Sequence, residues 1–262
     1  MRPRNSSAPG GMQAEATRGL LDRDYQSSPG LQGLTVHSGD SVNTGEWPTW
    51  AERSLSGARL QTYATAAGGR SAAIRLYWWN IEVSAAFYGP LHCLEVALRN
   101  ALHGALMHRF GRPDWWSIAP LDADGARLVS DAQTKCGRRI NHRPATADDV
   151  VAELSFGFWV KLLSRRYDRT FWVPALHRAF PRGSGRRDDL HRQFTTMMLL
   201  RNRISHHEPI HHRRLEADHA TLFRLLDLLN ADLSAEARQL DRVPTVLKQR
   251  QDTCAGLRTP QF

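Results

Sequence analysis

The chain has 262 residues, of which 41% are hydrophobic and 23% charged, so it can bury a hydrophobic core and is not a wholly disordered protein. Its formal charge is +9, and only three of its 35 cationic residues are lysine. This charge favours a polyanionic partner, nucleic acid before an anionic membrane surface, although a GC-rich genome would also enrich arginine. The three cysteines show no CxxC spacing, which argues against disulfides and a cysteine zinc site.

Residues 1–54 are rich in Gly, Ser and Pro and show no sustained hydrophobic period, which predicts a disordered N-terminal extension. No stretch of the chain reaches the roughly 20 apolar residues of a membrane-spanning helix. The N-terminus also lacks the apolar segment of a secretory signal. We therefore expect a cytoplasmic protein with no membrane partner.

Residues 55–250 consist of amphipathic segments separated by Gly or Pro, without the alternating runs typical of strands, and predict one all-α domain. Gly89 and Pro90 predict a break between two helices that would form an antiparallel hairpin. Thr146 and Asp149 have the spacing of a capping box. The expected helices span about 70–88, 91–109, 122–139, 146–165, 187–207, 215–230 and 234–250. Residues 251–262 are expected to be a tail.

The predicted helix at 187–207 contains a charged residue where an apolar one is expected. At about 100° per residue, its apolar side chains form one stripe, and Arg201 falls within that stripe. The stripe consists of Leu190, Phe194, Met197 and Ile204. A buried guanidinium without a partner costs several kcal/mol, so Arg201 must meet a carboxylate, a phosphate or a subunit interface.

Two further polar residues accompany Arg201. Asn202 and His206 are spaced i, i+4 and project together from the helix. Pro209 predicts that the helix ends near His206 or His207, where the helix dipole favours an imidazolium. A histidine beside a fixed arginine suits phosphodiester chemistry, since one group moves protons while the other neutralises charge on the phosphorus.

The segment RNRISH at 201–206 matches the R-x4-H motif and resembles the HEPN superfamily of all-α ribonucleases. The longer segment RNRISHHEPI resembles the Abi-like (abortive infection, D/F type) branch. LEVALRNAL at 94–102 and LSFGFWVKLL at 154–163 occupy the order expected for that branch. The resemblance covers about residues 70–230 and implies a HEPN-like helical bundle with additional helices.

The resemblance implies a metal-independent endoribonuclease that needs no cofactor and acts in abortive-infection phage defence or as a toxin. In such an enzyme the ribose 2′-OH attacks its own phosphate, with Arg201 and His206 as the catalytic pair and Asn202 as the orienting residue. It also implies RNA as partner, a homodimer with a composite active site, and an antitoxin protein or RNA. The alternatives are a non-catalytic RNA-binding or scaffold module and a purely structural helical protein with buried Arg–Glu pairs.

Glu95, Arg99 and His207 are predicted to surround the catalytic residues. Glu95 intrudes on an apolar stripe and is expected to pair either with Arg99, four residues on, or with Arg201 from the other helix. His207 is expected either to contact RNA or to cap its helix.

We predict RNA contacts for three arginines, Arg186, Arg187 and Arg203. Arg186 and Arg187 end an arginine-rich run at 165–187, which is either a phosphate-binding track or a solvated loop. The HHEPIHH cluster at 206–212 is not expected to bind a metal, because it straddles a proline-broken helix end and lacks HExxH geometry.

Overall fold

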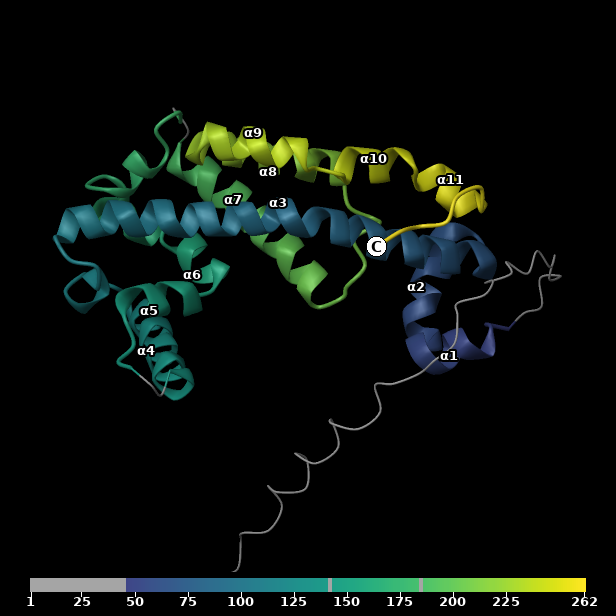
Figure 1. The fold of residues 1–262 in the computed structure, drawn as a ribbon, viewed down its shortest axis with the longest axis horizontal. Coiled ribbons are helices and arrows are strands. Elements are labelled where there is room, and N and C mark those ends of the chain that lie inside the picture. Colours follow the sequence, from purple (N-terminus) through teal and green to yellow (C-terminus); the bar gives the residue numbers. More distant parts are fainter. Residues whose placement is uncertain (1–45, 141–142, 184–185) are drawn as a thin grey trace, which may run out of the picture. The chain divides into compact units, whose positions relative to one another are not determined.

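The computed structural model describes residues 46–140, 143–183 and 186–262 (Figure 1). These ranges contain helices and no strand, which confirms the predicted all-α fold class. Residues 1–45 of the predicted N-terminal extension lie outside the described residues. The end of that extension is helical, because the first helix already begins at Thr49.

The bounds of the helices are α1 Thr49–Leu55, α2 Gly57–Ala67, α3 Arg70–Phe110, α4 Ala123–Arg139, α5 Ala147–Glu153, α6 Phe156–Lys161, α7 Arg187–Ser205, α8 Leu215–Leu229, α9 Ala231–Gln239, α10 Val243–Lys248 and α11 Arg250–Ala255. The predicted bounds of α4, α7 and α8 agree with these to within two residues. In this part of the chain, no helix has the length and apolar character needed to cross a bilayer.

The central element is α3, a single helix of 41 residues, so the predicted break and hairpin at Gly89 and Pro90 are wrong (Figure 1). A proline inside a helix removes one backbone hydrogen bond and costs about 3 kcal/mol. Here Pro90 is buried together with Phe87, Leu91 and Leu94. Full burial of each such apolar side chain contributes about 1.5–3 kcal/mol, so packing outweighs the cost of the proline.

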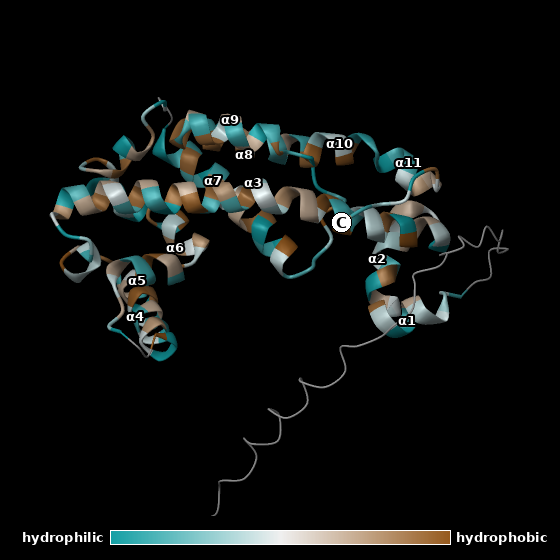
Figure 2. Ribbon diagram, in the orientation of Figure 1, coloured by the Kyte–Doolittle hydropathy of each residue, from teal (hydrophilic) through white to brown (hydrophobic). Residues whose placement is uncertain are grey.

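The core that fixes the site lies where α3, α7 and α8 contact one another. Hydrophobic and hydrophilic residues alternate along these helices, as their brown and teal segments show (Figure 2). On α7 the predicted apolar stripe is confirmed, since Leu190, Phe194 and Met197 are buried and Ile204 is half-buried. This packing sets the rotation of α7 about its axis and turns Arg201 toward α3.

Two predicted helices are each divided. The segment 146–165 begins with the predicted capping box of Thr146 and Asp149, but α5 ends at Glu153. Leu154 is extended, and the side chain of Ser155 accepts a hydrogen bond from the Phe158 amide at 3.3 Å, which starts α6. The segment 234–250 is likewise divided among α9, α10 and α11.

The predicted tail at 251–262 is folded onto α3. The guanidinium of Arg258 donates two hydrogen bonds to the carboxylate of Glu82, at 2.7 and 2.5 Å. Glu82 is only 2% exposed. Burial alone would raise the pKa of this carboxyl, but the bonds from Arg258 and from the Gln261 amide hold it below its usual value. The sequence prediction missed this contact because it joins residues far apart in the chain.

Candidate functional site

Helix α7 ends in a tight turn that places the histidines after it. The His207 amide donates to the Ile204 carbonyl at 3.0 Å, and the Glu208 amide donates to the Arg203 carbonyl at 2.8 Å. These two bonds form a Schellman motif, with His207 at the left-handed position, φ 56°. The predicted end of the helix at His206 or His207 is therefore confirmed.

Two roles were considered for His207, capping of its helix and contact with RNA, and the structure shows the first. Its left-handed backbone satisfies the end of α7, and histidine is among the residues that tolerate this conformation. Its carbonyl accepts a hydrogen bond from the Arg59 guanidinium on α2 at 2.6 Å. The imidazole of His207 is exposed, so a contact with RNA stays a prediction.

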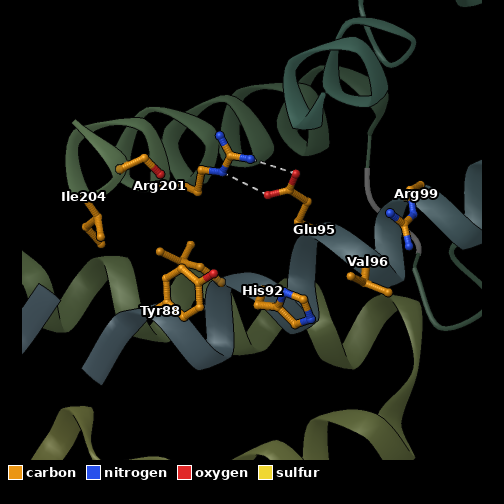
Figure 3. A pocket seen from close by; sticks show the side chains of 9 residues that line it. Tyr88, His92, Glu95, Val96, Arg99, Arg201 and Ile204 are labelled. Atoms are coloured by element: carbon orange, nitrogen blue, oxygen red, sulfur yellow. Dashed lines mark hydrogen bonds and ion pairs between the residues drawn. The ribbon is translucent and has the colours of Figure 1, made fainter. Parts of the chain in front are cut away.

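Arg201 and Glu95 form a bidentate ion pair between α7 and α3 (Figure 3). The Nε and Nη2 atoms of Arg201 each lie 3.0 Å from one carboxylate oxygen of Glu95. The side chains are 37% and 22% exposed, respectively. Of the two partners considered for Glu95, the structure thus selects Arg201. The pair also explains how an arginine lies in the apolar stripe of α7.

A second subunit is therefore not needed to accept Arg201, because the structure provides one of the three partners considered for it, a carboxylate. This carboxylate belongs to Glu95 of the same chain, and Arg201 is half-buried, so the full burial of its guanidinium expected from the apolar stripe is not observed. The homodimer remains a proposal that depends on the family resemblance alone.

Asn202 lies against Arg201, whereas His206 is separate from the pair. The Asn202 Oδ1 atom accepts a hydrogen bond from Nη1 of Arg201 at 3.3 Å. His206 follows the last residue of α7 and is exposed, and among the described residues none hydrogen bonds to its imidazole. The structure thus brings Arg201, Asn202 and Glu95 together and leaves the imidazole of His206 in solvent.

The ion pair lines a cleft of about 270 Å³ between α3 and α7 (Figure 3). Its lining residues are Tyr88, Leu91, His92, Glu95, Val96 and Arg99 on α3, and Arg201, Ile204 and Ser205 on α7. The sequence prediction missed Tyr88 and His92. Their spacing from Glu95 places all three on one face of a helix, but the expected break at Gly89 and Pro90 assigned Tyr88 to another element.

Arg99 lines the same cleft without forming the i, i+4 pair with Glu95. Its Nε donates to the Asn100 Oδ1 atom at 3.3 Å. Within the described part of the chain, no carboxylate lies within 4.0 Å of its guanidinium. The ion pair considered for Arg99 and Glu95 is therefore not formed, and Arg99 adds positive charge to the cleft.

The three arginines predicted to contact RNA differ in their surroundings. Arg187 is 8% exposed, and its guanidinium bonds to the Asp168 carboxylate at 2.7 Å and to the Leu163 carbonyl at 2.8 Å. Arg187 also donates to the Asp188 carboxylate, and its three bonds hold the start of α7 in place, so the structure does not favour the predicted RNA contact. Arg186 is exposed, and Arg203 is half-buried with Glu208 at 3.6 Å, so their RNA contacts stay predictions.

The histidine cluster after α7 is divided between surface and interior. His206, His207 and His212 are exposed, whereas His211 is 4% exposed. Burial lowers the pKa of His211 to about 4, so this ring is neutral at pH 7. In the described ranges, no three His, Cys, Asp or Glu side chains gather in a way that could hold a metal ion.

The fold and the site define an all-α protein with a charged cleft between two packed helices. Comparison of the chain with family models, with curated proteins and with solved structures finds no match. The resemblance to HEPN ribonucleases therefore depends on the motif at 201–206 and on the order of the two supporting segments.

Proposed function

We propose that the protein is a metal-independent endoribonuclease of the HEPN type, with Arg201, Asn202 and His206 as its catalytic residues. The observation that carries this proposal is the way in which Arg201 is held. Glu95 binds the side of the guanidinium formed by Nε and Nη2. Asn202 accepts a third N–H group, on Nη1, so one N–H on Nη1 and one on Nη2 remain for oxygens of a phosphate.

In the proposed reaction the ribose 2′ oxygen forms a bond to phosphorus while the bond from phosphorus to the 5′ oxygen breaks. The products are a 2′,3′-cyclic phosphate and a 5′-hydroxyl end. His206 exchanges the protons, removing one from the 2′-hydroxyl and returning one to the leaving oxygen. Arg201 neutralises the charge that develops on the phosphorane, and Asn202 orients its guanidinium.

The biological setting of this proposal comes from the HEPN resemblance alone. It includes abortive-infection phage defence or toxin activity, a homodimer in which two such clefts face one another, and an antitoxin protein or RNA as partner. A dimer would also bring a second Arg201 and His206 to the same substrate.

The proposal is tested with purified protein and RNA in the presence of EDTA, followed by analysis of the 3′ ends. We expect cleavage products with cyclic phosphate ends, and loss of cleavage in Arg201→Ala and His206→Ala. His108→Ala is the matched control, since His108 is an exposed histidine on α3 outside the cleft. Cleavage by both active-site variants at the wild-type rate would refute the assignment of the site.

A second candidate function is a non-catalytic RNA-binding module that uses the same cleft. The observation that favours it is the position of His206, which does not line the cleft with Arg201. In this case the wild-type protein yields no product at any concentration, and RNA binding survives His206→Ala.

A further inference from the structure

The α3 wall of the cleft presents an aromatic pair that the catalytic proposal does not use. Tyr88 is 65% exposed although it lies on the central helix of the fold. Its ring is stacked with the imidazole of His92, with 6.5 Å between the ring centroids and 22° between the planes. Both residues line the cleft beside Glu95 and Arg201 (Figure 3). Both side chains are exposed, so their rings are not part of the hydrophobic core.

A cationic residue, Arg99, lies further along the same face of α3. Tyr88 and His92 are one turn apart, and Arg99 lies about 16 Å from Tyr88 along the helix axis, at 1.5 Å per residue. Arg201 approaches this face between them, because its partner Glu95 lies between His92 and Arg99 in the sequence. The cleft therefore offers stacking surfaces at one end and guanidinium groups at its centre and other end.

An arrangement of this kind matches the chemistry of unpaired nucleotides. Nucleobases stack on tyrosine and histidine rings, while arginine guanidinium groups contact the phosphates that link them. A purely apolar partner fits poorly, because Glu95, Arg99 and Arg201 charge the cleft. A duplex fits poorly as well, because its bases are already stacked on one another and do not offer their faces to a side chain.

We propose that Tyr88 and His92 form a base-stacking site that holds one unpaired nucleotide of an RNA strand beside Arg201, with Arg99 contacting the backbone of the same strand. This inference deepens the proposed function and rests on it for the choice of RNA as ligand. It adds two positioning residues outside the R-x4-H motif, and it makes single-stranded RNA the substrate class.

The test is fluorescence anisotropy with a labelled 2′-O-methyl RNA oligonucleotide, single-stranded or annealed to its complement. This probe lacks the attacking hydroxyl, so binding is measured without cleavage. We expect Tyr88→Ala to weaken binding of the single strand by at least about fivefold, and Tyr88→Phe to retain binding because the phenyl ring still stacks. His92→Ala should weaken it in the same direction. Binding of the duplex should not change in any of these variants.

Phe262→Ala is the matched control, because Phe262 is an aromatic residue of similar exposure, 70%, that does not line the cleft. The Phe262→Ala variant should bind the single strand with the same affinity as the wild type. Thermal unfolding of each variant checks that the fold is intact, which we expect because the Tyr88 side chain is exposed.

The inference is overturned if Tyr88→Ala binds the single strand as tightly as the wild type, or if it loses single strand and duplex equally. The outcome is separable from that of the proposed function. Cleavage by the wild type together with unchanged binding by Tyr88→Ala removes the stacking site and keeps the nuclease. Weakened binding by Tyr88→Ala without cleavage by the wild type keeps the stacking site and removes the nuclease.

Discussion

The strength of the Arg201–Glu95 pair can be measured with a double-mutant cycle of Arg201→Ala, Glu95→Ala and the double variant. Its two bonds of 3.0 Å and its exposures of 37% and 22% place the pair between a solvated and a buried ion pair. Unit charges about 4 Å apart attract by about 4 kcal/mol at an effective dielectric constant of about 20. Desolvation and the ordering of two long side chains offset much of this attraction. We expect a net coupling free energy of about 1.5 kcal/mol.

The coupling is obtained from urea unfolding of the wild type and the three variants. The pair of Arg238 and Asp227 serves as the control cycle. These residues lie 3.1 Å apart, with side chains 50% and 46% exposed. We expect a coupling of about 0.5 kcal/mol or less for this pair, as is usual for exposed ion pairs.

A coupling for Arg201 and Glu95 no larger than that of the control would refute this reasoning. It would mean that Glu95 does not fix the orientation of Arg201 in solution. The guanidinium tip would then not be held for a phosphate, and the observation that carries the proposed function would be lost.

Three further predictions concern residues outside the ion pair. Arg187→Ala should lower the free energy of unfolding by about 2 kcal/mol, because it removes a side chain that is 8% exposed and leaves the buried Leu163 carbonyl without its hydrogen bond, while the ion pair with Asp168, 41% exposed, adds little. Arg186→Ala should change it by less than about 0.5 kcal/mol, and equal losses in urea unfolding would contradict the expected difference between the two residues. Gly89→Ala should raise the melting temperature, since it gains about 1 kcal/mol of helix propensity at an exposed position with open space, and Gly111→Ala should lower it because φ is 71° there. If Gly89→Ala melts earlier than the wild type, α3 is not continuous at that point. The folded state holds the pKa of Glu82 below its unfolded value, so the stabilising contribution of this carboxylate is present above about pH 4.5 and is lost as the pH falls through the folded pKa. Glu82→Gln should therefore flatten the acid side of the stability profile measured by urea unfolding, and parallel profiles would argue against the contribution.

The sequence alone determined the all-α class, the bounds of α4, α7 and α8, and the capping box at Thr146. These features depend on interactions within a few residues, such as helical periodicity and local side-chain caps. The sequence also required a partner for Arg201, because its neighbours on the stripe are apolar and a lone buried guanidinium is costly.

The tertiary structure alone decided which partner Arg201 has. Glu95 is 106 residues away in the chain, and local pattern left Arg99 equally eligible. It also decided that α3 continues through Pro90, since the compensating burial comes from other helices packed around it. Because α3 is continuous, Tyr88 and His92 lie on the same wall of the cleft. The helix break expected from the sequence placed them in different helices.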